Sequence, residues 1–181
     1  MTDGVYAFAM TLLVVNMELP EGFDPKSNQE LLSGLARLFD TFIAYVITFL
    51  VLASFWLGRA QASDGPETAS AAYAWASILH LFPVTFMPFA MLVAGRFDYP
   101  AAIWLYAANM IVLALSVIAI SLIAGTKTGR ARLPDGSIEL GILIASALLS
   151  VAIGGVAPGY AMYAYLLNLA TPLVAPAIYG R

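Results

Sequence analysis

Polar side chains interrupt an apolar stretch at the start of the chain, MTDGVYAFAMTLLVVNMEL. Asp3 lies at the beginning of this stretch, Thr11 in its middle, and Asn16 and Glu18 near its end. A helix buried only for its hydrophobicity does not need a threonine there. Polar groups inside a bilayer are usually retained for function. Carboxylates could attract cations, and a hydroxyl could replace part of the water shell of an ion.

A helical projection of residues 1–19, at about 100° per residue, orders these polar side chains. One face about 100° wide carries a stripe of apolar and small residues together with a single hydroxyl: Gly4, Phe8, Thr11, Leu12, Val15 and Leu19. The stripe has two interpretations. Small residues permit close contact between helices, or the stripe forms a pore wall with hydrophobic rings from Phe8, Leu12 and Val15 and a hydroxyl ring from Thr11.

Other polar residues have structural explanations beside functional ones. Asp3 follows Thr2 and can cap the helix by accepting hydrogen bonds from free amides. His80 precedes Pro83 and Pro88, so it is expected to hydrogen-bond a neighbouring helix or a freed carbonyl. Arg59 ends an apolar segment, where it can extend to the lipid headgroups.

The composition predicts an integral membrane protein. The 181 residues are 61% hydrophobic and 10% charged, against roughly 25% charged in an ordinary soluble domain. The absence of cysteine excludes thiolate metal sites and disulfides. A net charge of −3 gives no footprint for nucleic acid. No set of nucleophile, base and pocket is visible, so an enzyme is not expected, nor is a cofactor or a bound structural metal.

Hydropathy predicts an all-α fold, residues 1–181 forming one domain of six transmembrane helices. Each segment approaches the roughly 20 apolar residues that a spanning helix needs. The expected spans are residues 2–19, 38–57, 69–95, 101–124, 138–157 and 160–179.

Loop charges predict the orientation in the membrane. Six spans place both termini on one side, together with five basic residues: Arg59, Lys127, Arg130, Arg132 and Arg181. The other side has three basic residues, Lys26, Arg37 and Arg96, and an acidic link after the first span. The expectation is a multi-pass protein of the cell membrane with cytoplasmic termini and an acidic opposite face.

Several motifs resemble the transmembrane protein 175 family, in its bacterial single-repeat branch. TDGVYAFAMTLLV is similar to the family's FSDGVFAIAMTLLVL signature, and Asp3 and Gly4 match its aspartate and glycine. SFW at 54–56, FPVTFMPFAMLVAG at 82–95 and WLYAANMIVLAL at 104–115 resemble later segments in the same order. The resemblance covers residues 2–115 by motif and the remainder by hydropathy.

The resemblance implies a potassium-preferring cation channel that assembles as a homotetramer, with a central pore lined by the first helix and no re-entrant filter loop. It places Phe8 at the hydrophobic constriction, followed by Thr11, Leu12 and Val15 along the pore. Arg59 stands where the family commonly has a histidine, and Phe8 replaces an aliphatic residue. Trp56, Arg59, His80 and Asn109 form the candidate structural polar network.

The partners implied are three further copies of the chain, the lipid bilayer and permeating monovalent cations, with potassium the only metal ion expected. One alternative is a secondary transporter or proton-coupled carrier with His80, Asn109 or Asn168 as internal polar sites. Another is a non-conducting membrane scaffold.

Overall fold

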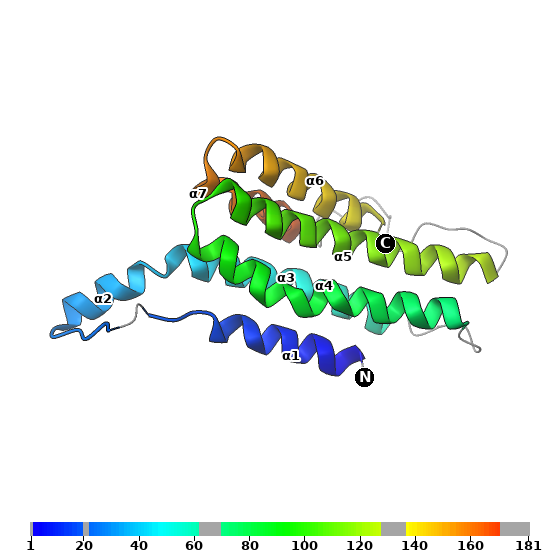
Figure 1. Ribbon diagram of the computed structural model, residues 1–181, viewed down its shortest axis with the longest axis horizontal. Helices are drawn as coiled ribbons and strands as arrows, with labels where there is room; N and C mark the ends of the chain where they lie inside the picture. The colour runs from blue at the N-terminus through cyan, green and yellow to red at the C-terminus, as the bar shows by residue number, and fades with distance from the viewer. Residues whose placement is uncertain (1, 20–21, 62–69, 128–136, 171–181) are drawn as a thin grey trace.

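In the computed structural model, the protein is a bundle of helices that lie side by side (Figure 1). The structure describes residues 2–19, 22–61, 70–127 and 137–170. Over these ranges the fold is helical and has no β-strand, which confirms the all-α prediction. The elements are α1 (Thr2–Val15), α2 (Asn28–Ala36), α3 (Phe39–Gln61), α4 (Ala71–Arg96), α5 (Pro100–Lys127), α6 (Ser137–Gly154), α7 (Pro158–Ala161) and the 3-10 helix η1 (Met162–Ala170).

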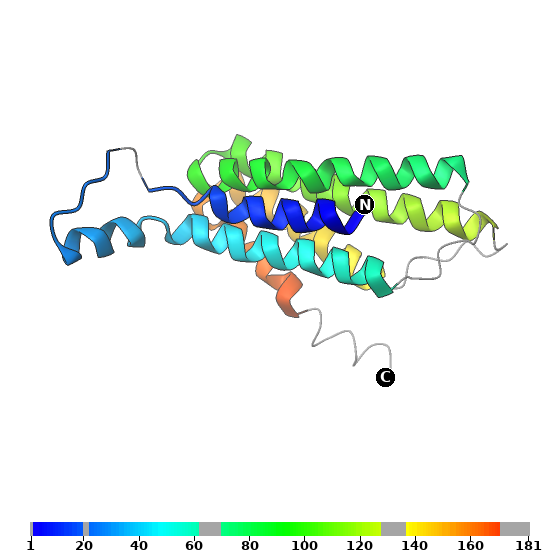
Figure 2. The same cartoon turned by 90° about the horizontal axis from the view of Figure 1, so that it is seen from below.

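Helix α4 lies at the centre of the packing that positions α1. It packs against α1, α3 and α5, while α6 packs against α5 and η1. Figure 2 shows α1 alongside both α3 and α4. The short helix α2 extends beyond the end of the bundle (Figure 1).

Four helices are long and apolar enough to cross a membrane among the described residues: Phe39–Ala60, Ala71–Arg96, Pro100–Gly125 and Ser137–Gly154. They correspond to the second to fifth expected spans and make this a multi-pass membrane protein. The first expected span, 2–19, is helical only over Thr2–Val15. At about 1.5 Å per residue, α1 is shorter than a hydrocarbon core of about 30 Å. In the last expected span, 160–179, residues 171–179 lie outside the described ranges.

The local sequence explains where two of these helices begin. Ser70 accepts a hydrogen bond from the amide of Tyr73 and so caps α4. Pro100 opens α5, where its missing N–H costs nothing.

Small residues allow the helices to approach closely. A Cβ atom on Gly95 of α4 would lie 3.2 Å from the Cα of Thr41 on α3. The Thr41 hydroxyl donates to the Gly95 carbonyl at 2.8 Å. On α6, a Cβ on Gly154 would lie 2.9 Å from Cγ2 of Ile103 on α5. These contacts fix the frame against which α1 packs.

Candidate functional site

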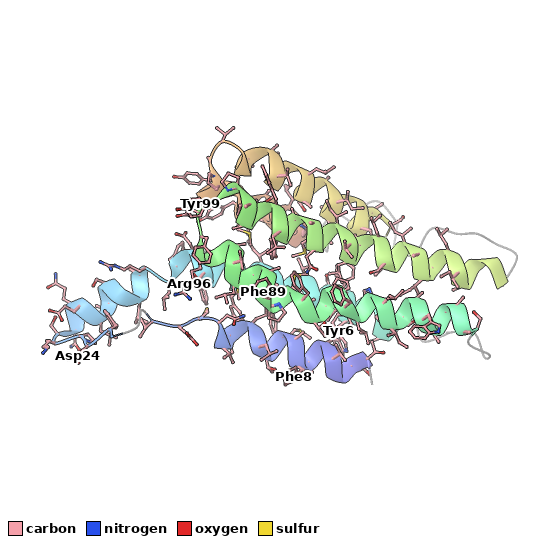
Figure 3. The ribbon with its side chains drawn as sticks, viewed as in Figure 1. Tyr6, Phe8, Asp24, Phe89, Arg96 and Tyr99 are labelled. Atoms are coloured by element: carbon pink, nitrogen blue, oxygen red, sulfur yellow. The ribbon has the colours of Figure 1, made fainter. Side chains whose placement is uncertain are left out.

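Helix α1 has one face packed on the bundle and one face free of it. Tyr6, Ala9 and Leu13 are buried against the neighbouring helices. Phe8 is 65% exposed and Val15 is 61% exposed. In Figure 3, Tyr6 lies on the side of α1 toward α4 and Phe8 on the opposite side. The two faces therefore point in opposite directions.

The stripe derived from the projection lies mainly on the free face. Gly4, Phe8, Thr11 and Val15 are exposed, whereas Leu12 is half-buried. Apart from Leu12, the residues of this stripe are largely uncovered by the rest of the described chain. The stripe is a surface that a bilayer, a second chain or a pore must meet.

Thr11 uses its proton inside the helix. Its hydroxyl donates to the carbonyl of Phe8 at 2.8 Å. A threonine hydroxyl has one proton and two lone pairs, so the exposed oxygen acts outward only as an acceptor. An acceptor is the group that a cation or a water molecule in its shell can use.

A groove of about 570 Å³ runs beside the free face of α1. It lies along the flank toward α4, and its lining is apolar apart from one hydroxyl: Gly4, Val5, Phe8, Ala9, Leu12 and Thr85. Phe8 and Leu12 thus belong to both the stripe and the groove. The groove widens the apolar surface that the single chain leaves uncovered.

Among the contacts described, three side-chain hydrogen bonds attach residues 2–19 to α3 and α4. The indole N–H of Trp56 on α3 donates to Asp3 at 3.1 Å. The Tyr6 hydroxyl lies 2.6 Å from Nε2 of His80 on α4. Past the helix end, the Asn16 amide donates to the Pro88 carbonyl at 2.9 Å. Asp3 thus lies in the first turn of α1 and has a partner on another helix. Its expected role as a helix cap stays a prediction.

The four candidate network residues each have their own contacts. Trp56 contacts Asp3, and His80 contacts Tyr6 and Ser116. Asn109 donates to the Pro83 carbonyl at 3.1 Å and is buried. Arg59 is half-buried in the last turn of α3. The structure brings none of these four side chains into a hydrogen bond with another among the interactions described.

Sequence reasoning did not identify two participants in these contacts, Tyr6 and Ser116. Tyr6 lies on the side of α1 opposite Phe8. Its hydroxyl, on an otherwise apolar face, was the sequence feature that could have indicated a hydrogen-bond partner. Ser116 is in α5, and nothing in its sequence neighbourhood distinguishes it from the other serines of the spans. Ser116 contacts His80 only because α5 packs against α4.

The acidic residues expected at one face lie around α2 and the neighbouring helix ends. Asp24, Glu30, Asp40 and Asp98 are exposed. Lys26 pairs with Asp24 at 3.7 Å, an exposed contact that contributes little energy. Among the described residues there is no group of three His, Asp or Glu side chains that could hold a metal ion.

Comparison with known proteins identifies similar sequences and a similar structure. Residues 1–88 match the family model described as endosomal/lysosomal potassium channel TMEM175. A protein named as a potassium channel from Streptomyces collinus is 29% identical over 87 residues, 48% of this chain and 41% of that one. One from Chryseobacterium is 27% identical over 89 residues, 49% of this chain and 43% of that one. These alignments span less than half the length of either relative.

The fold is similar over nearly the whole chain. The crystal structure of a lysosomal potassium-selective channel TMEM175 homolog from Chamaesiphon minutus superposes with a TM-score of 0.78. The match covers 95% of this chain and 93% of that one at 20% sequence identity. The family described is one of ion channels and not of enzymes. Residues 1–88, just under half of the chain, are thus similar to the TMEM175 family in sequence, and 95% of the chain is similar to a TMEM175 homolog in fold.

Proposed function

We propose that the protein is a potassium-preferring cation channel in which the free face of α1 lines the ion path. The observation that carries the proposal is this face itself: Phe8 and Val15 are largely exposed on a helix whose other side is buried at Tyr6, Ala9 and Leu13. A relative named for potassium channel activity and a similar fold in a potassium-selective channel support it.

The proposed pore has a hydrophobic constriction and one polar ring. Phe8, Leu12 and Val15 form the constriction, which closes a pore by making water unfavourable within it. Thr11 presents its acceptor oxygen to the ion. The potassium ion is the permeant species, and no cofactor takes part.

The proposal includes four copies of the chain around a central pore, each spanning the membrane six times. One helix cannot enclose a path for ions, so several α1 helices must surround it. The groove beside Phe8 and Leu12 is then covered by a neighbouring copy instead of lipid. The protein resides in the cell membrane with cytoplasmic termini, as the loop charges indicate.

The structure gives less support to a secondary transporter. Such a carrier needs internal polar groups that converge on a substrate. His80 contacts Tyr6 and Ser116, and Asn109 contacts Pro83 and Met87. Asn168 contacts Ser146 and the Tyr165 carbonyl. These three candidate sites share no partner among the contacts described.

Potassium flux from liposomes that contain the purified protein tests the proposal. We expect potassium to leave loaded vesicles faster than sodium under matched gradients, without a coupling ion. Detergent-solubilised protein should have the mass of four chains. Flux that requires a proton or sodium gradient would identify a carrier instead, and a monomer would exclude a pore lined by α1.

A further inference from the structure

A chain of hydrogen bonds, buried at Tyr6 and His80 and part-buried at Ser116, joins α1 to two further helices on the side opposite Phe8. Tyr6 and His80 are both 0% exposed. The Tyr6 hydroxyl lies 2.6 Å from His80 Nε2, and His80 Nδ1 lies 2.7 Å from the Ser116 hydroxyl. The contacts therefore run from α1 through α4 to α5.

One assignment of donors and acceptors gives every proton in this chain of hydrogen bonds an acceptor. The Ser116 hydroxyl donates its proton to the Leu113 carbonyl at 2.7 Å, so its oxygen accepts a hydrogen bond from Nδ1 of His80. A neutral imidazole protonated at Nδ1 is an acceptor at Nε2. The Tyr6 hydroxyl consequently donates to Nε2. The imidazole is held from both sides, and every proton in the chain has an acceptor.

Tyr6 is placed to control the rotation of α1 about its own axis. At about 100° per residue, Val15 and Phe8 project within roughly 20° of the direction opposite Tyr6. A rotation of α1 by about 30° moves an atom at a side-chain radius of about 6 Å by roughly 3 Å. That displacement separates the hydroxyl from Nε2 by about 4 Å, beyond hydrogen-bond distance.

The other two hydrogen bonds that attach residues 2–19 to α3 and α4 restrict the rotation of α1 less. The Trp56–Asp3 bond is exposed, and the Asn16–Pro88 bond is part-buried and lies past the last helical residue. Of the three, only the Tyr6–His80 bond is buried and lies within the middle turns of α1. Water competes least for a buried bond.

We propose that His80 is a positioning residue that locks the rotation of α1, through Tyr6 on one side and Ser116 on the other. The lock directs Phe8 and Thr11 away from the bundle. Its consequence for ion flow rests on the proposed function: rotating Phe8 out of the pore requires the Tyr6–His80 bond to break.

Single substitutions can release the lock without removing a side chain from the core. Tyr6→Phe removes one oxygen and keeps the ring. Tyr106→Phe is the matched control, because Tyr106 is also fully buried and loses a comparable bond, to Thr48 at 2.8 Å, that does not involve α1. His80→Gln retains an acceptor and a donor, whereas His80→Leu retains neither.

The orientation of α1 is measured by electron paramagnetic resonance of a nitroxide at Ala7→Cys or Val14→Cys, both exposed positions, in a chain without native cysteine. With Tyr6→Phe and His80→Leu, we expect a second spectral component. The ratio of locked to rotated helix should fall roughly three- to tenfold, the factor of one buried hydrogen bond. Tyr106→Phe should leave the spectra unchanged, and His80→Gln should restore most of the locked component.

Flux measurements on the same variants separate this inference from the proposed function. Potassium flux of Tyr6→Phe should differ severalfold from that of Tyr106→Phe. Spectra of Tyr6→Phe identical to those of the parent would overturn the lock, whether or not the protein conducts. Altered spectra in a protein that does not conduct would support the lock and reject the channel.

Discussion

Truncation of Phe8 perturbs the proposed constriction with little effect on the folded chain. Phe8 is 65% exposed, so about a third of its surface is packed within the chain. Full burial of a phenylalanine side chain is worth up to about 3 kcal/mol. Phe8→Ala should therefore destabilise the single chain by only about 1 kcal/mol.

The same change should have a large effect on ion flux. If Phe8 forms the narrowest apolar ring, its removal lets water and ions enter more readily. A tenfold rise in flux requires about 1.4 kcal/mol less barrier, which is within the transfer free energy of one phenylalanine ring. We expect Phe8→Ala to raise potassium flux at least about tenfold.

The assay is potassium efflux from liposomes, with equal amounts of parent and variant protein reconstituted. The matched control is Phe82→Ala, because Phe82 on α4 is 68% exposed but lies outside the α1 stripe. This control should conduct like the parent. Unchanged flux of Phe8→Ala, with its oligomer intact by mass, would refute the assignment of Phe8 to the constriction.

Two further substitutions test selectivity and packing. Thr11→Val replaces the acceptor oxygen of the free face with a methyl group; it should change the potassium-to-sodium permeability ratio, and an unaltered reversal potential would remove Thr11 from ion selection. Gly154→Ala places a Cβ 2.9 Å from Ile103, so overpacking should destabilise the protein by about 1 to 3 kcal/mol. Thermal unfolding in detergent measures this loss. Gly141→Ala on the same helix is the control, because a Cβ there meets nothing within 4 Å, and equal melting temperatures for the two variants would show that the α5–α6 contact adapts.

Hydropathy predicts the long helices because each must satisfy its own backbone in lipid. The second to fifth spans consequently agree with α3 to α6 within a few residues. The residues of the α1 stripe could be predicted to share one face, since Phe8 and Thr11 follow the helical period, but their spacing left open whether that face packs within the chain. The apolar and hydroxyl side chains of that face could be identified from the sequence because they belong to a single helix.

Contacts between distant segments could not be predicted in this way. The bond between Tyr6 and His80 joins residues 74 positions apart, and it depends on how α1 and α4 pack side by side. The sequence indicates that His80 needs a partner in an apolar span, but several helices could supply one. The Asn16–Pro88 bond, just past the end of α1 at Val15, likewise joins residues 72 positions apart.

The central claim is that the free face of α1 lines the ion path, and a single cysteine tests it most directly. The parent chain contains no cysteine, so a charged, water-soluble thiol reagent acts only at the position introduced. Val112→Cys on α5 serves as the control, being 48% exposed on a helix that packs against α4 and α6. We expect the reagent to block potassium flux through Thr11→Cys and to leave Val112→Cys unaffected. Full flux through Thr11→Cys, after labelling at that position is verified by mass, would contradict the account.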